Sequence, residues 1–195
     1  MAKAETRNII KTTAYALFQE KGYEKTTMRE LAATAGVGLG TIFQHFPDKP
    51  SLLIAAFEEE LGGLVDQGLS TMPINLGLRD QLLYLMRPIL TFYAQNHKLA
   101  RVLIKEIFFL EGKAAERLQE IEMDVSQKLA NLFVGAVQRG EIDPETDIAD
   151  AVTALWAIYS LVLLYGLRAN TLDVVDQLAW LGRLFDQQLR GLRPE

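Results

Sequence analysis

The stretch Gly36–Lys49, GVGLGTIFQHFPDK, decides how the N-terminal part of this chain folds. Gly36 can take the left-handed backbone conformation of a tight turn, which places a helix boundary there. Pro47 breaks the chain again further on. The residues between these two breaks predict one short helix over 39–45.

This short helix has one apolar side and one outward side. Val37, Ile42 and Phe46 are spaced by five and four residues, so they predict the side that packs into a small core. The other positions are left to face outward, where threonine and glutamine can bind base edges or phosphates. These outward positions are Leu39, Gly40, Thr41, Phe43, Gln44 and His45.

Two further helices precede the stretch. A first helix carries an apolar stripe from Ile10 to Phe18 and ends at Gly22. A short second helix begins at Thr26-Thr27, with Glu30 as capping-box partner, and stops at Gly36. Two short helices joined by a turn, after a longer one, match a helix-turn-helix, whose second helix enters a DNA major groove. Phosphate contacts are predicted for Thr26, Thr27 and Lys49.

Composition favours a globular cytoplasmic protein with a polyanionic partner at its N-terminal end. The chain has 195 residues, 49% of them hydrophobic and 23% charged, and no cysteine. Its N-terminus has no apolar core of the signal-peptide type. The net charge is -5, yet residues 1–50 contain seven Lys/Arg against five Asp/Glu, a net charge of +2. A mildly basic end on an acidic body indicates a polyanion partner.

Helical periodicity continues to the end of the chain. After a long helix that begins at Pro50, we predict helices at about 76–95, 97–110, 114–139, 146–168 and 172–191. The fold class is therefore all-α, with about nine helices. Charge and helix length both change near residue 50, which divides the chain into a helix-turn-helix DNA-binding domain, 1–50, and an effector-binding and dimerisation domain, 51–195.

The N-terminal quarter of the chain resembles the DNA-binding head of the TetR family of transcriptional regulators. This resemblance implies a homodimer that binds successive major grooves of a pseudo-palindromic, double-stranded DNA operator. It also implies that a small-molecule effector in the C-terminal domain releases the DNA. The resemblance implies DNA contacts for Thr27, Thr41, His45 and Lys49. By the same resemblance, Leu39, Gly40 and Gln44 stand at positions where the residue varies with the operator sequence. The resemblance is carried by Phe18, Gly22-Tyr23, Thr26-Thr27, Leu31-Ala32, Ala35-Gly36-Val37, Gly40-Thr41, His45-Phe46 and Lys49.

Two positions depart from the family pattern. Phe43 stands where the family usually has tyrosine, so one hydroxyl contact to phosphate is lost, about 1 kcal/mol. Gly38 stands where a serine-like helix cap is common, and glycine caps only slightly worse. Both departures predict a modest or strongly salt-sensitive operator affinity.

The last two helices offer a dimer interface. Residues 151–167 contain no charge, but they only reach the lower limit for a membrane span and no basic flank supports insertion, so we predict no membrane contact. The final helix carries an apolar stripe that could instead be an intramolecular core. The predicted interface residues are Leu155, Leu163, Val174, Leu178, Leu181, Phe185 and Leu189.

The effector pocket is predicted beside Pro88, which interrupts a helical pattern and would kink it. Sites of this kind are mainly apolar with a few polar anchors, so we expect a largely apolar or aromatic effector. The candidate walls are Met86, Phe92, Tyr93, Phe108, Phe109, Met123, Trp156 and Tyr159.

Other function classes fit less well. An enzyme lacks support, because the two histidines have no nucleophile or metal-ligand spacing around them. The glycines at 36, 38 and 40 resemble a dinucleotide-binding loop, but Thr41 stands where a further glycine is required and no strand precedes them. We therefore predict no cofactor and no metal. The alternative is a helical adaptor, or a small-molecule-binding protein without DNA binding.

Overall fold

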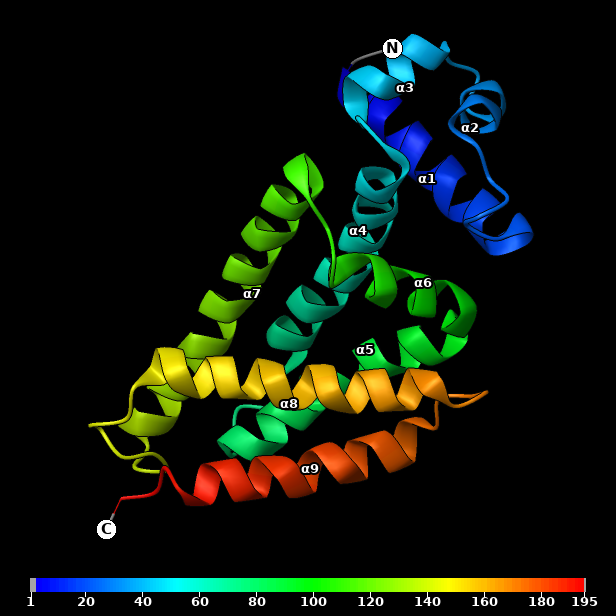
Figure 1. Cartoon of the computed structure of the whole chain (residues 1–195). Helices are drawn as coiled ribbons and strands as arrows, with labels where there is room; N and C mark the ends of the chain where they lie inside the picture. Colours follow the sequence, from blue (N-terminus) through cyan, green and yellow to red (C-terminus); the bar gives the residue numbers. More distant parts are fainter. Residues whose placement is uncertain (1–2, 195) are drawn as a thin grey trace. The chain divides into compact units, whose positions relative to one another are not determined.

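The computed structural model describes residues 3–194, and this range contains nine α-helices and no strand (Figure 1). The predicted all-α class is confirmed. In chain order the helices are α1 (Lys3–Lys21), α2 (Met28–Thr34), α3 (Leu39–His45), α4 (Lys49–Thr71), α5 (Leu78–Gln95), α6 (His97–Ile107), α7 (Gly112–Gln138), α8 (Ile148–Arg168) and α9 (Val174–Arg190).

Local chemistry sets where these helices begin and end. Gly22 and Gly36 both have positive φ, 89° and 67°, so they end α1 and α2 in a conformation that other residues rarely adopt. The Thr27 hydroxyl accepts from the Glu30 N–H at the start of α2. Asp173 caps α9 in the same way, because its carboxylate accepts from the Val175 and Asp176 N–H groups.

Contacts between Cα atoms divide the described chain into two compact units. The first, the head unit, comprises residues 3–62 and 98–119. The second, the body unit, comprises residues 63–97 and 120–194. The contacts thus group the residues differently from the predicted division at residue 50, because α6 joins the head unit and the cut falls inside α4.

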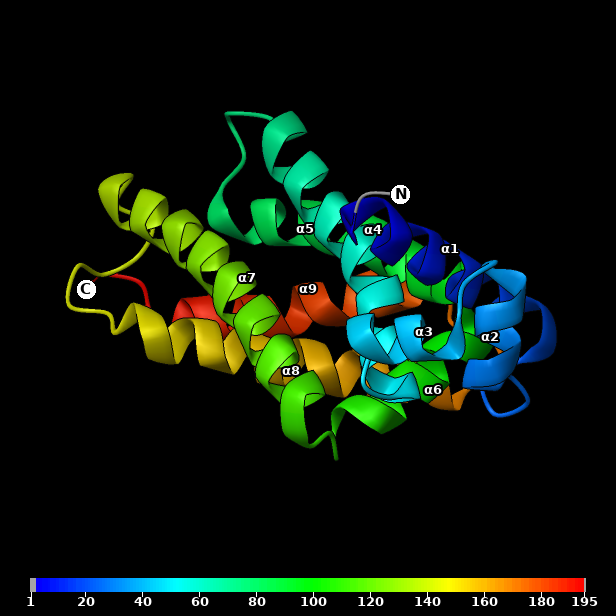
Figure 2. The ribbon, with the colours of Figure 1, turned by 90° about the horizontal axis from the view of Figure 1, so that it is seen from above.

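The head unit holds α1, α2 and α3 around a small core, and both views group these helices together (Figure 1 and Figure 2). α2 packs on α1 and on α3. Ile10 and Phe18 of α1, Leu31 of α2, and Ile42 with Phe46 at α3 are all buried. This is the core that the apolar spacing predicts, except that Val37 is only partly buried.

In the body unit, α9 lies beside α5 and α8 (Figure 1). This packing corrects the predicted dimer interface, because the stripe of α9 and the matching residues of α8 are buried inside their own subunit. The intramolecular core that the sequence left open is what the structure shows. The buried residues are Leu155, Leu163, Leu178, Leu181, Phe185 and Leu189, whereas Val174 is partly exposed.

The opposite side of α8 is left uncovered. Among the described residues, α8 is the one helix long and apolar enough to cross a membrane by length and composition, and 28% of its most apolar stretch is buried. Leu161 and Tyr165 are 47% and 51% exposed. An apolar helix side that stays exposed in this way is typical of an interaction surface.

Candidate DNA-binding interface and effector site

The outward side of α3 is the candidate DNA-binding surface. Leu39 and Phe43 are exposed, as are Gly40 and Gln44. Thr41 and His45 lie on the other flank and are partly buried. The outward orientation follows from the burial of Ile42 and Phe46 on the inner side of the helix.

Gly40 lies in open space on this surface. A Cβ added at Gly40 would meet no atom within 4 Å, so packing does not require glycine there. At the start of α3, Gly38 makes no side-chain capping hydrogen bond. Because glycine has no side chain, Gly38 and Gly40 leave the α3 backbone accessible, which permits close approach of another molecule.

The two neighbouring threonines have different places. Thr27 is exposed and caps α2. Thr26 is 1% exposed, and its hydroxyl donates to the Gly22 carbonyl oxygen at 2.9 Å. The predicted phosphate contact of Thr26 is therefore wrong, because its side chain is inside the head unit and already bonded.

Lys49 also has internal partners. Its ammonium donates to the carbonyl oxygens of Tyr23 at 2.9 Å and Thr26 at 3.2 Å. It also lies 4.2 Å from the centre of the Tyr23 ring, a cation–π contact. Burial raises the pKa of the Tyr23 hydroxyl. Lys49 therefore joins α4 to the turn before α2, and its phosphate contact stays a prediction.

The remaining positive charges of the head unit are partly paired. Lys21 bonds to Glu30, and Lys11 bonds to Glu59. Lys25 and Arg29 are exposed next to the start of α2. These two are further candidates for phosphate contacts that the sequence pattern did not single out.

In the body unit, four of the predicted pocket residues form an aromatic group. Tyr93 of α5 and Tyr159 of α8 hydrogen-bond through their hydroxyls, and burial raises the pKa of Tyr93 to about 12. The Trp156 ring packs edge-on to Tyr159, with ring centres 5.8 Å apart, and Phe92 packs edge-on to Tyr93. The Trp156 indole N–H donates to the Ser126 hydroxyl at 2.9 Å, a partner that the sequence did not indicate.

The other predicted pocket residues are placed differently. Met86 is buried on α5. Phe108, Phe109 and Met123 are 58%, 88% and 67% exposed, and their assignment as pocket walls stays a prediction. Phe108 and Phe109 lie in the head unit, in the turn between the end of α6 at Ile107 and the start of α7 at Gly112.

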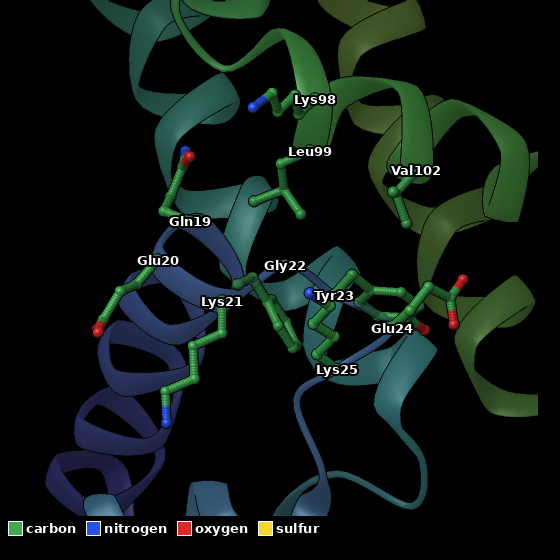
Figure 3. Close-up of a pocket in the computed structure, with 11 residues that line it drawn as sticks. Gln19, Glu20, Lys21, Gly22, Tyr23, Glu24, Lys25, Lys98, Leu99 and Val102 are labelled. Carbon is green, nitrogen blue, oxygen red and sulfur yellow. The ribbon is translucent and has the colours of Figure 1, made fainter.

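The head unit contains a cavity of about 370 Å³ that none of the eight predicted pocket residues line. It lies between the end of α1, the turn that follows, and α6, with Leu99 and Val102 directed toward the turn (Figure 3). Its rim carries charges of both signs, including Lys98, Glu20 and Glu24. No sequence pattern indicated this cavity, because its two sides are far apart in the chain.

No group of three or more histidine, aspartate or glutamate side chains in residues 3–194 could hold a metal ion. What the structure offers is an exposed helix face in one unit and, in the other, an aromatic group of which Tyr93 is buried and the remaining members are partly buried.

Comparison with known proteins identifies the family. Residues 10–56 match the family model described as "Bacterial regulatory proteins, tetR family", and residues 75–162 match "Tetracyclin repressor-like, C-terminal domain". The chain is 26% identical over 178 residues to the transcriptional repressor KstR of Rhodococcus jostii, covering 91% of this chain and 81% of that one. It is 24% identical over 135 residues to the fatty acid metabolism regulator protein of Bacillus subtilis, covering 69% and 70%.

Solved structures agree in fold. The fatty acid degradation regulator FadR of Bacillus halodurans has a TM-score of 0.74 at 25% identity, covering 95% of this chain and 99% of that one. FadR of Thermus thermophilus, solved in complex with lauroyl-CoA, has a TM-score of 0.79 at 22% identity, covering 97% and 96%. The two family models together span more than half of the chain. The chain therefore belongs to the TetR family of DNA-binding, ligand-responsive transcriptional regulators, and it is not an enzyme.

Proposed function

We propose that this regulator is a cytoplasmic repressor that binds a pseudo-palindromic operator as a homodimer and leaves the DNA when a small effector binds. The observation that carries the proposal is the open outward face of α3, held by buried Ile42 and Phe46 within a head that matches the family model. DNA-contact roles are proposed for Thr27, Thr41 and His45, and Lys25 and Arg29 are added for phosphates.

Homodimerisation is supported by the uncovered side of α8. Ala154, Ala157, Leu161 and Tyr165 recur at helical spacing along it, and all four are exposed. The Tyr165 ring packs edge-on against Trp180 of α9, with ring centres 5.8 Å apart, so the surface continues onto the neighbouring helix. We propose this surface as the dimer interface, in place of the buried stripe. A second copy is the partner that would cover it, because two-fold pairing of such helices makes a four-helix interface.

An acyl-CoA is the effector class that we propose first. Two relatives are named for fatty acid metabolism or degradation, and one related structure contains lauroyl-CoA. In this chain, the aromatic group around Tyr93 and Tyr159 supplies apolar surface, and the two hydroxyls supply a polar anchor. Since two hydroxyls carry two hydrogens and their mutual bond uses one, the pair retains a donor for a ligand.

A mobility-shift experiment tests the proposal directly. The full chain is titrated onto DNA fragments that flank its own gene, at several salt concentrations, with and without lauroyl-CoA. We expect sequence-specific retardation whose affinity falls steeply with salt, because phosphate contacts release counterions. Release by lauroyl-CoA, and not by free coenzyme A, would support the effector class.

The controls separate the parts of the proposal. Tyr93→Phe should alter release by effector while operator affinity stays within about twofold, since the lost group is a single hydroxyl in the body unit. Retardation that is insensitive to sequence, or absent at low salt, would contradict the regulator function. Retardation that lauroyl-CoA does not affect would leave the DNA-binding function standing and remove the acyl-CoA proposal.

A further inference from the structure

We propose that α3 reads A·T base pairs, with Gln44 bound to an adenine and the Leu39–Phe43 flank against a thymine methyl group. The inference rests on the proposed function and adds the class of base that the operator presents to α3.

Successive residues of an α-helix are turned by about 100°, so the buried pair of α3 fixes where the others point. Ile42 and Phe46 define the inner side. At this angular step, Gln44 lies opposite them, next to Gly40. The exposed face therefore has glutamine at its centre and a bare backbone beside it, which lets the helix sit close enough for a glutamine amide to reach a base edge.

The two flanks differ in chemistry. Leu39 and Phe43, four residues apart, form an apolar flank that is 36% and 47% exposed. Thr41 and His45 form the polar flank, and both are partly buried. The His45 ring lies tilted against Phe46, with ring centres 6.4 Å apart, so it is turned back toward the head core.

Base chemistry then selects among the four pairs. A glutamine amide can donate to N7 and accept from N6 of adenine, and apolar side chains contact the thymine methyl group. Guanine is most often read by arginine or lysine, and cytosine by a carboxylate. Residues 36–47 contain none of these four charged residue types. The exposed apolar flank would remain uncovered over G·C pairs, which have no methyl group in the major groove.

The first test is selection of duplexes from a randomised pool by the full-length chain. We expect half-sites with an adenine next to thymines at the centre of the recognised sequence. In the selected duplex, 7-deazaadenine in place of that adenine removes the N7 acceptor, and deoxyuridine in place of thymine removes only the methyl group. Each replacement should weaken wild-type binding by about tenfold, the scale of a good base contact.

Variants assign each effect to its side chain. Gln44→Ala should bind the unmodified duplex more weakly and lose its sensitivity to 7-deazaadenine alone. Leu39→Ala and Phe43→Ala should lose sensitivity to deoxyuridine alone. Gln138→Ala, an exposed glutamine at the end of α7, is the matched control and should respond like the wild type.

The outcomes separate this inference from the proposed function. Selected half-sites with G·C pairs at the centre, or wild-type binding unchanged by either modified base at every position, would overturn A·T readout while leaving the regulator function intact. Failure to enrich any sequence would contradict the proposed function itself.

Discussion

At the scale of single residues, a substitution at Gly40 is predicted to change the stability and the operator affinity in opposite directions. Its position is helical, exposed and free of neighbours within 4 Å. Gly40→Ala should therefore raise the unfolding free energy by roughly 0.5–1 kcal/mol, because alanine favours helix more than glycine does. The same methyl group would meet the DNA, so operator affinity should fall.

Denaturant unfolding and mobility shift on the same preparation measure both quantities. Gly63→Ala is the matched control, because Gly63 is also an exposed helical glycine with open space around it, on α4. It should gain stability and keep its operator affinity. Equal affinities for Gly40→Ala and wild type would mean that the α3 backbone does not approach DNA closely.

Thr26 and Thr27 are predicted to respond in opposite ways. Thr26→Val removes the buried hydroxyl that donates to Gly22, which should lower the unfolding free energy by about 1 kcal/mol. At temperatures where the head is folded, its operator affinity should stay near wild type. Thr27→Ala loses a helix cap, also about 1 kcal/mol, and should weaken operator binding as well.

Thr27→Ser retains the capping oxygen, so it should recover the stability and most of the binding. The prediction fails if Thr26→Val weakens operator binding as much as Thr27→Ala does when both proteins are fully folded. The measurements are denaturant unfolding and a binding isotherm at a temperature well below both transitions.

These residues also show how far sequence reasoning reaches. The spacing of Ile42 and Phe46 was enough to predict the buried side of α3, because periodicity alone decides it. The capping-box spacing to Glu30 distinguishes Thr27 from Thr26, but nothing in the sequence shows that the Thr26 hydroxyl is buried or that two backbone carbonyls surround the Lys49 ammonium. Such partners depend on where the turn after α1 lies in three dimensions.

At the scale of elements, Glu141 holds the start of α5. Its carboxylate accepts from the Leu78 N–H at 2.7 Å and from the Arg139 side chain. Partial burial alone would raise the pKa of Glu141, but these two bonds outweigh it and lower the pKa. The N-cap residue of α5 is Gly77, which makes no side-chain hydrogen bond to the helix. The Glu141 carboxylate therefore takes the place of a capping side chain.

This geometry predicts a pH dependence with a definite sign. A carboxyl whose pKa is lower in the folded chain contributes stability above its unfolded pKa, about 4.3, and loses it as the pH falls through the folded pKa. Glu141→Gln should lower the unfolding free energy at pH 7 and flatten its decline in acid. Unfolding curves over a series of pH values, for this variant and for Glu145→Gln as an exposed control, test it. Parallel pH profiles for wild type and Glu141→Gln would contradict it.

Helix ends were more predictable than helix faces. Helices end at Gly22 and Gly36 through the backbone chemistry of glycine itself, so the sequence indicates these ends locally. α8 is apolar on all sides, so its periodicity has no preferred direction. Which side is buried depends on α9 packing against it, and for that reason the sequence could not show that the predicted interface residues lie in the core of the chain.

At the scale of the whole molecule, two-fold pairing would raise the DNA affinity that one short recognition helix provides. α3 has seven residues and no lysine or arginine, so one head has few contacts with which to hold DNA. Two linked heads bind as one unit, and the second contact forms at a high effective concentration. We infer that operator binding depends on the surface that joins two copies.

Leu161→Glu tests this dependence at the centre of the uncovered side of α8. The side chain is 47% exposed in the single chain, so glutamate is tolerated there without disturbing the subunit core. In a dimer it would place two like charges in an apolar interface and leave them without partners, which is costly. We expect a folded monomer by sedimentation, with operator affinity lower by about 100-fold or more. Ile74→Glu, at a residue 92% exposed in the loop before α5, should stay dimeric and bind normally. A Leu161→Glu protein that is dimeric and binds like wild type would show that the two copies meet elsewhere.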